Sequence, residues 1–318
     1  MRVLLATDGS ASADKARDLV ASLRWPSETV VRIVAAVEAG LEVAAAPFAT
    51  VPGGLLNELD AELARHADVT LDAAERMLGD AGLRTERMVL AGRAADEIVK
   101  EARAWPADLV VLGNRGHGTI ATMLLGSTSA EVVDHAPCPV LVVRDGSIAS
   151  IVLASDGSEP AAEAERLLVG WPMFRHLPAT VVSVAVTGHP LDPGLAAGLS
   201  EAVMTSWGQD IDAARHEVAE MAERVAGRLR AGGMSASARA REGDPAGEIV
   251  TVARSLERPL IVMGTRGHTG MARLLLGGVA RNVLYHAPGS VLVVRQGIHV
   301  DLTAFAAAAP EPEALARR

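Results

Sequence analysis

Aromatic residues, cysteine and positive charge are scarce in this 318-residue chain, and their scarcity sets the first limits on its function. Only 3% of the residues are aromatic, and the formal net charge is −9 with a pI near 5.5. A nucleic-acid surface needs clustered Lys and Arg and usually stacking rings, so we expect no nucleic-acid partner. The single cysteine, Cys138, excludes a disulfide framework or a cysteine metal site and predicts a half-buried small hydrophobe.

Long apolar runs and the two commonest phosphate-binding motifs are also missing. No run approaches the roughly 18 residues that span a bilayer, and the N-terminal run reaches Asp8 too early for a signal peptide. We therefore expect a cytoplasmic protein without a membrane partner. Neither G-x-x-x-x-G-K-[ST] nor G-x-G-x-x-G after a strand occurs, so the sequence supports neither a Walker-type hydrolase nor an NAD-type dehydrogenase.

What the chain does have is a glycine-punctuated stretch from Gly113 to Thr128. It follows the apolar run 108–112, carries further glycines at Gly116 and Gly126, and ends in the hydroxyl pair Ser127-Thr128. Glycines allow a backbone to approach an oxyanion closely, and the N–H groups and dipole of a helix N-terminus favour negative charge. A strand, a glycine loop and a helix start in this order predict a phosphate site.

This arrangement occurs twice. Asp8-Gly-Ser10 returns as Asp156-Gly-Ser158, 148 residues later, whereas the three glycines return 151 residues later as Gly264, Gly267 and Gly277. The chain is therefore a tandem duplication, and the three extra residues lie between these landmarks. We expect domains at 1–146 and 149–295. Residues 296–318 match neither unit, and their alanine-rich sequence with two prolines is typical of a mobile tail.

Short apolar runs alternate with helical patterns through both units. In the first unit strands are predicted near 3–6, 30–37, 86–90, 109–112 and 140–143, and helices after Ser10 or Ser12 and near 55–78, 94–104 and 127–135. This alternation predicts a parallel sheet with helices on both faces. Ligands of such sheets bind beyond the carboxyl ends of the strands, where the strand order reverses.

The spacing G-x2-G-x9-G-S resembles the nucleotide-binding signature of the universal stress protein family, and VLLATDGS and HAPCPVLVV at the two ends of the unit agree. The resemblance extends from Arg2 to Arg295. It implies an α/β fold of two tandem, Rossmann-like, doubly wound five-stranded sheets of order 3-2-1-4-5, so that Asp8 and Gly113 face one another across a crevice. Exposed edges are unfavourable, so the two domains should pair within the chain through strands 140–143 and 291–294. A homodimer is left open.

The resemblance also assigns individual roles. Gly116, Gly126 and Ser127 would hold phosphates, Thr128 would assist, and Asp8 would lie beside the ribose or a phosphate-bound Mg²⁺. Adenine would be held by backbone at the end of the second strand. The predicted nucleotide-binding residues are Asp8, Ala36, Val37, Gly113, Gly116, Gly126, Ser127 and Thr128 in the first unit, and Asp156, Val186, Gly264, Gly267, Gly277, Gly278 and Val279 in the second. No catalytic or metal-ligating residue is predicted.

The second loop departs from the pattern, because Gly278-Val279 stands where the first has Ser127-Thr128. One lost hydroxyl–phosphate hydrogen bond costs roughly 1.5–3 kcal/mol, which is about ten- to a hundredfold in affinity. The first site should therefore be the stronger. Arg273 and Arg281, which replace Thr122 and Ala130, are candidates to compensate.

Histidine and arginine side chains of the loops admit simpler interpretations than catalysis. His117 and His268 have no Cys, second His or carboxylate at ligand spacing, so each is interpreted as solvated or beside a phosphate. Arg115 and Arg266 could contact phosphate or lie on the surface, and both alternatives stay open. The resemblance implies an ATP-binding regulator or stress-survival factor, with Mg²⁺, rather than an enzyme. The alternatives are a slow ATPase, for which no lysine or base–nucleophile pair is found near the loops, and a nucleotide-free scaffold of the same fold.

Overall fold

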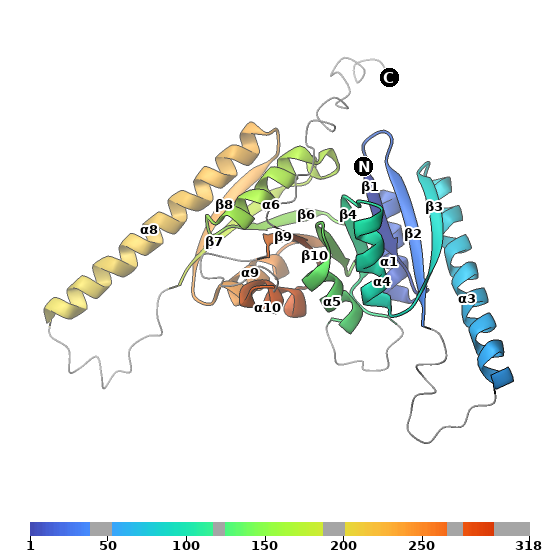
Figure 1. Ribbon diagram of the computed structural model, residues 1–318. Coiled ribbons are helices and arrows are strands. Elements are labelled where there is room, and N and C mark those ends of the chain that lie inside the picture. Colours follow the sequence, from blue (N-terminus) through green and yellow to red (C-terminus); the bar gives the residue numbers. More distant parts are fainter. Residues whose placement is uncertain (39–52, 117–124, 187–200, 266–275, 296–318) are drawn as a thin grey trace, which may run out of the picture.

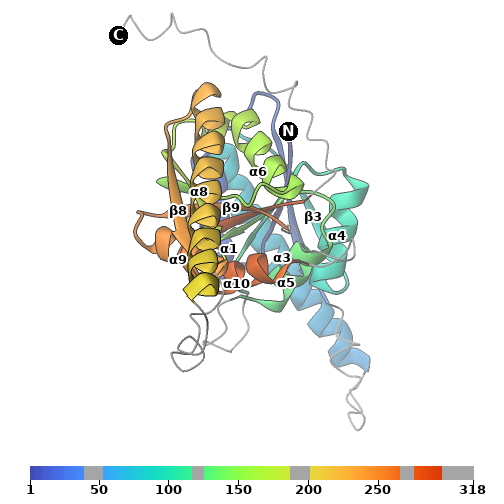
Figure 2. The same cartoon turned by 90° about the vertical axis from the view of Figure 1, so that its left-hand side faces the viewer.

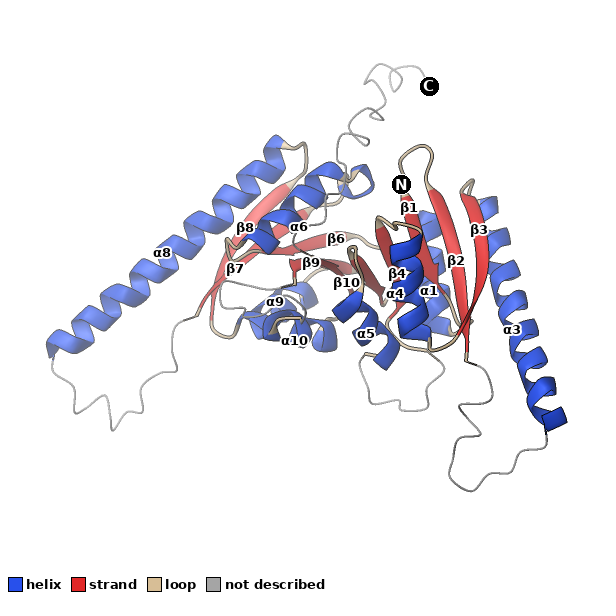
Figure 3. Cartoon of the chain, in the orientation of Figure 1, coloured by secondary structure: helices blue, strands red, loops and turns tan. Residues whose placement is uncertain are grey.

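The computed structural model describes residues 1–38, 53–116, 125–186, 201–265 and 276–295. Its strands form one continuous sheet with helices on both faces (Figures 1 and 3). The first half consists of β1 (Arg2–Ala6), α1 (Ala11–Ser22), β2 (Val30–Val37), α3 (Gly53–Asp80), β3 (Arg84–Ala91), α4 (Ala94–Ala104), β4 (Leu109–Gly113), α5 (Ser127–His135) and β5 (Val140–Val143).

The second half repeats this plan. It consists of β6 (Ser150–Ala154), α6 (Glu159–Gly170), a short 3₁₀ helix (Pro172–Phe174), β7 (Ala179–Ala185), α8 (Glu201–Ala231), β8 (Ala236–Glu242), α9 (Pro245–Arg254), β9 (Pro259–Gly264), α10 (Gly278–His286) and β10 (Ser290–Val294). The alternation of strands and helices therefore confirms the α/β fold that was expected from the sequence. Within the described ranges, the short 3₁₀ helix is an element that the sequence did not predict.

The strand order is β3-β2-β1-β4-β5-β10-β9-β6-β7-β8, which is 3-2-1-4-5 in each half. Neighbouring strands within a half are parallel, whereas β5 and β10 pair antiparallel, with Leu141 opposite Leu292. The two expected five-stranded sheets are thus joined into one ten-stranded sheet. Their pairing through the last strands is confirmed, and it covers the edge that each half would otherwise expose.

Each face of the sheet carries a continuous apolar core, because alternate strand residues point to opposite faces. On one face α1, α3, α6 and α8 pack over residues such as Leu5 and Leu153, and on the other α4, α5, α9 and α10 pack over residues such as Leu4 and Val152. Every residue of β4 and β10 is buried. Strands that are covered on both faces have continuous apolar sequences, and for this reason they could be predicted from the sequence.

The three extra residues of the second half are accommodated in its long helix. β2 and β7 correspond at an offset of 148 residues, since Val3 pairs with Val31 and Ile151 with Ala179, whereas β3 and β8 correspond at 151. Between them, α3 has 28 residues and α8 has 31. Figures 1 and 2 place these two helices at opposite ends of the sheet. No helix among the described residues is long and apolar enough to cross a membrane.

Two arginines at equivalent positions cross between the halves. Arg144, directly after β5, donates to the Leu284 carbonyl near the end of α10, and Arg295, directly after β10, donates to the Val133 (2.9 Å) and Asp134 carbonyls near the end of α5. The last carbonyls of a helix have no partner within the helix and favour positive charge. Burial, together with the nearby Arg115, lowers the pKa of Arg144 to about 10, so this guanidinium remains charged at neutral pH.

Cys138 lies between α5 and β5 and is 2% exposed, which is deeper than the half-buried position expected. Burial in apolar surroundings, with a smaller contribution from the Asp108 charge, raises the pKa of its thiol to about 12. Since the thiolate is the reactive form, the folded protein should hold this side chain inert.

We therefore expect Cys138 to resist thiol reagents in the native state. At pH 8 roughly one thiol in ten thousand would be ionised at such a pKa. Labelling with a disulfide reagent should be at least a hundredfold slower in buffer than in guanidinium chloride, measured by absorbance against time. Rapid, complete labelling of protein that keeps its native circular dichroism would contradict the burial described here.

Candidate functional site

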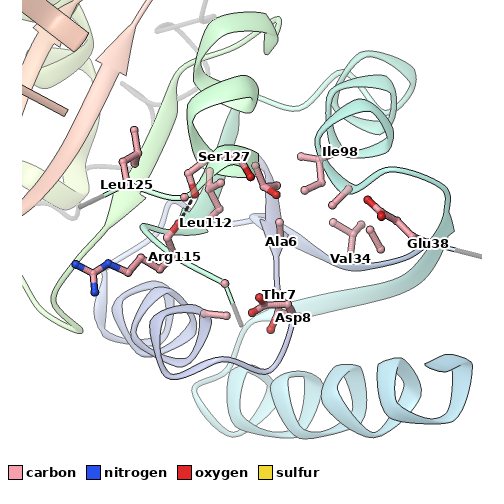
Figure 4. Close-up of a pocket in the computed structure, with 18 residues that line it drawn as sticks. Ala6, Thr7, Asp8, Val34, Glu38, Ile98, Leu112, Arg115, Leu125 and Ser127 are labelled. Carbon is pink, nitrogen blue, oxygen red and sulfur yellow. Dashed lines mark hydrogen bonds between the residues drawn. The ribbon is translucent and has the colours of Figure 1, made fainter. Parts of the chain in front are cut away.

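A cavity of about 710 Å³ opens at the carboxyl ends of β1, β2 and β4, beside α4 and α5 (Figure 4). This is where the strand order of the first half reverses, and the volume lies within the range of about 300–1,000 Å³ that is typical of small-molecule sites. The lining residues are Ala6, Thr7, Asp8, Ala13, Val34, Ala36, Glu38, Ala94, Ile98, Leu112, Gly113, Arg115, Gly116, Leu125, Gly126, Ser127, Thr128 and Ser129.

One end of the cavity is formed by the N-terminus of α5. Gly126 is the N-cap residue, its N–H donates to the Asn114 carbonyl (2.8 Å), and the helix begins at Ser127 as predicted. N–H groups of a first helical turn have no partner within the helix, so they are available to an anion. Ser129 anchors this turn, because its buried hydroxyl donates to the Gly113 carbonyl at the end of β4 (2.8 Å).

Asp8 lies across the cavity from this helix start (Figure 4). Its Oδ1 accepts a hydrogen bond from the Ser10 N–H (3.0 Å), which fixes the carboxylate at the start of α1. Ser10, rather than Ser12, is the N-cap of α1 and accepts from the Ala13 N–H (3.2 Å). A Cβ atom at Gly116 would lie 2.5 Å from Asp8 Oδ2. The Asp8 motif at the end of β1 and the glycine motif at the end of β4 therefore lie next to each other, as the predicted strand order requires.

Gly113 has a packing role that its place in the motif did not reveal. A Cβ atom there would lie 2.5–2.7 Å from Ser12 Oγ and from the Ser12 backbone, and one at Gly264 would lie 2.6–2.7 Å from Pro160. These glycines let the end of β4 or β9 approach the first turn of the helix beside it. Gly113 still lines the cavity, but its lack of a side chain is explained by this contact.

The other end of the cavity contains the end of β2, where backbone groups alternate in direction. The Val34 carbonyl points to β1 and accepts from the Thr7 N–H (2.9 Å), whereas the Val37 carbonyl points to the β3 side and accepts from the Gly92 N–H (2.9 Å). By this alternation Ala36 directs its N–H and C=O to the β1 side. There the ladder has already ended at Ala6, so no backbone partner for Ala36 exists among the described residues. Ala36 lines the cavity and Val37 does not.

The corresponding position in the second half is Val184, two residues before Val186. The Val182 carbonyl accepts from Ser155 (2.9 Å) and the Ala185 carbonyl from Gly243 (3.1 Å), as Val34 and Val37 do in the first half. Val186 therefore corresponds to Glu38, and it is 73% exposed. β2 and β7 correspond at an offset of 148 residues, which the sequence alone did not reveal. This offset explains why the counterpart of Ala36 is Val184 and not Val186.

The described residues on either side of the second loop keep backbone contacts found in the first half. Ser158 N–H donates to Asp156 Oδ1 (3.0 Å), and Gly277, the N-cap of α10, donates to the Thr265 carbonyl (2.8 Å). A Cβ atom at Gly278 would meet nothing within 4 Å among the described atoms, and Val279 is 38% exposed. Gly267, with Arg266, His268 and Arg273, lies outside the described residues, as His117 does in the first loop.

The arginines considered for phosphate contact have other neighbours. Arg281 lies 3.4 Å from Asp134, near the end of α5, and so bridges the two halves. Arg115 lines the cavity, but its side chain extends away from Asp8 and Glu38 (Figure 4), and its charge acts on Arg144 at the junction of the halves. Compensation for the missing hydroxyls by Arg281 therefore has no support from its contacts.

Several cavity residues were not predicted. They are Thr7, Glu38 and Ser129, together with apolar residues of the wall such as Val34, Ile98 and Leu125. The hydroxyl of Ser129 stands two residues after Ser127, and Glu38 directly follows a predicted strand, so both had a weak signal in the sequence. The apolar residues are indistinguishable there from ordinary core.

Comparison with known proteins places the chain in a family. It matches the sequence model of the universal stress protein family over residues 1–144 and 148–295. A universal stress protein of Mycolicibacterium smegmatis is 26% identical over 92% of this chain and 96% of its own length. One from Mycobacterium tuberculosis is 30% identical over 60% of this chain and 62% of its own length. The chain therefore belongs to the universal stress protein family.

The fold agrees with this assignment. The crystal structure of a universal stress protein from Archaeoglobus fulgidus covers 93% of this chain and 98% of its own, with a TM-score of 0.62 at 18% identity. At that identity the likeness concerns the architecture alone. The arrangement of the cavity in this chain rests on the contacts described above.

We expect Gly113→Ala to destabilise the fold by about 1–3 kcal/mol, because the added methyl group would press on backbone atoms of Ser12 that no rotamer change can move. Chemical denaturation followed by circular dichroism measures this loss. Gly208→Ala, in α8, is the matched control. Nothing lies within 4 Å of that added Cβ, so it should stabilise the protein by roughly 0.5–1 kcal/mol. Equal behaviour of the two variants would contradict the packing role of Gly113.

Proposed function

We propose that the first half of this protein binds ATP together with Mg²⁺, and that the protein acts as a nucleotide-dependent regulator or stress-survival factor rather than as an enzyme. The observation that carries the proposal is a single cavity with two chemically different ends. The N-terminus of α5 and Asp8 form a polar end, and Val34, Ile98 and Ala36 line the other.

The polar end suits the phosphates. The hydroxyls of Ser127 and Thr128 and the N–H groups of the first turn of α5 supply donors, and the helix dipole adds favourable charge. Gly116 leaves room between the loop and Asp8, since a Cβ atom there would lie 2.5 Å from the carboxylate. These features support phosphate binding without a lysine.

Asp8 by itself would repel a phosphate, and a divalent cation removes the conflict. Mg²⁺ is commonly held by one or two carboxylates together with phosphate oxygens of the substrate, and it keeps several waters. The described residues fit this pattern, because Asp8 has one oxygen fixed by Ser10 and the other directed to the glycine loop. Mg²⁺ would supply charge neutralisation between carboxylate and phosphate.

The other end suits a purine base. Apolar side chains from β2 and α4 can contact the faces of a ring, and the backbone of Ala36 offers an N–H donor beside a C=O acceptor. The edge of adenine offers the complementary pair, a ring nitrogen acceptor beside an amino donor. This complementarity supports Ala36 as the adenine-holding residue and gives Val37 no such role.

Binding rather than catalysis fits the composition of the cavity. Among the described residues that line it, none is a lysine or a histidine. Nor do the described parts of the chain contain a group of three or more His, Cys, Asp or Glu side chains that could hold a metal ion on their own. A bound nucleotide would thus act through its effect on the protein.

The first test is Gly126→Asp, which should abolish nucleotide binding at the first site. A Cβ atom at this position would lie 3.4–3.8 Å from Arg115, Asn114 and Gly116 backbone atoms, so the fold can accept it. Its carboxylate would then compete with phosphate for the same N–H groups. Equilibrium titration with a fluorescent ATP analogue measures the loss, and thermal unfolding should stay cooperative.

Gly208→Asp is the charge-matched control, because it adds the same negative charge on an exposed part of α8. It should leave nucleotide affinity unchanged. If Gly126→Asp bound ATP as tightly as this control and melted normally, the glycine loop would be a turn without a ligand.

The second test concerns the inequality of the two halves. The second half keeps the contact of the helix N-cap, from the Gly277 N–H to the Thr265 carbonyl, but has Gly278-Val279 in place of the hydroxyl pair. Its affinity for ATP should therefore be roughly ten- to a hundredfold lower. Calorimetric titration of nucleotide-stripped protein should resolve one tight and one weak site. Ser127→Ala should weaken the tight site by a similar factor.

Ser129→Ala serves as a comparison, since it removes a hydroxyl that is already bonded to the Gly113 carbonyl. Its main effect should be on stability, by about 1 kcal/mol. If the two sites of the wild type bound ATP with equal affinity, and Ser127→Ala changed the affinity of neither, the hydroxyls would have no part in binding.

A further inference from the structure

Glu38 is the one carboxylate among the described residues at the base end of the cavity, and its side chain is exposed there. It follows β2 directly and lines the cavity with Val34, Ala36 and Ile98. Its carboxylate points inward, between Val34 and Ile98 (Figure 4). Within the described parts of the chain it makes no hydrogen bond or ion pair.

Strand geometry explains this position. Side chains alternate along β2, so Val34, Ala36 and Glu38 share the face that α4 covers, while Val37 packs on the opposite face. On this face Ala36 also presents its N–H and C=O along the edge of β2 beyond the end of β1. A carboxylate and a donor–acceptor pair therefore lie two residues apart at one end of the cavity.

We propose that Glu38 is the specificity-determining residue of the first site, and that its carboxylate accepts a hydrogen bond from the exocyclic amino group of adenine. The inference rests on the proposed function, since it concerns the base of the same nucleotide. The amino group carries two N–H bonds. One satisfies the Ala36 carbonyl while the ring nitrogen beside it accepts from the Ala36 N–H, and the other is directed to Glu38.

A base with a carbonyl group at this position lacks both donors. Hypoxanthine and guanine would place an oxygen against the Glu38 carboxylate and the Ala36 carbonyl, so that acceptors would face one another with no donor between them, which is unfavourable. Sites built to bond a ligand N–H reject the analogue that lacks it far better than apolar pockets reject a change of size. The first site should therefore select adenine by its amino group.

The second half lacks this recognition. The residue that corresponds to Glu38 is Val186, which is exposed as Glu38 is but has no polar atom in its side chain. Glu38→Val thus gives the first half the residue of the second. Glu38→Gln is the finer variant, because its amide can accept from an amino group or donate to a carbonyl.

The experiment compares ATP with ITP, its 6-oxo analogue, on wild type, Glu38→Gln and Glu38→Val by calorimetric titration. Wild type should prefer ATP by at least tenfold. Glu38→Val should lose roughly ten- to a hundredfold in ATP affinity with little change for ITP. In the Glu38→Gln variant the ratio of ATP affinity to ITP affinity should fall, mainly because the variant binds ITP more tightly than wild type does. Glu58→Gln, on an exposed part of α3, controls for the lost charge.

The outcomes separate this inference from the function on which it rests. If wild type bound ATP and the ratio of ATP to ITP affinity were the same in all three proteins, Glu38 would have no part in specificity while the ATP site would stand. If wild type preferred ITP, the carboxylate would be recognising a ring N–H and the proposal would be wrong. If wild type bound neither nucleotide, the proposed function would fail and this inference with it.

Discussion

The antiparallel pairing of β5 with β10 is the interaction on which the rest of the molecule depends. It turns two parallel sheets into one, and it makes the apolar core on each face continuous from one half to the other. It also brings the ends of α5 and α10 within reach of the arginines that follow the opposite half's last strand. Neither half is complete alone, because separating them would expose a strand edge and leave helix carbonyls without their charged partners.

Most of the fold could be predicted from the sequence, because strands buried on both faces are apolar throughout and their helices are strongly periodic. The start of α5 at Ser127 and the whole of β2 were located to the residue. What could not be predicted was where the two copies lose register. Sequence landmarks bracket the three additional residues between Asp8 and Gly113, and only the strand pairing shows that they fall after β7. For that reason the sequence indicates Val186, whereas Val184 is the structural counterpart of Ala36.

The two ends of the cavity differ in how much the sequence reveals. Phosphate recognition by a loop needs glycines and hydroxyls at fixed spacing, and this spacing can be read directly from the amino-acid sequence. The position of Ala36 depends instead on β2 extending three residues beyond Val34, the partner of the last residue of β1. This leaves the N–H and C=O of Ala36 without a backbone neighbour on that side among the described residues. Gly113 shows the converse, since a glycine within the motif owes its lack of a side chain to the contact with α1.

Because α8 is longer than α3, the two ends of the ten-stranded sheet differ, although the two halves of the chain otherwise repeat the same plan. Near their C-termini α3 and α8 match, with Leu78 and Leu229 equally buried at an offset of 151 residues. Three residues turn a helix by about 300° and lengthen it by about 4.5 Å, so toward the N-termini the equivalent side chains are about 60° out of phase. A surface formed by the outer part of one helix is therefore not reproduced on the other, and the two ends of the sheet present different shapes to their surroundings.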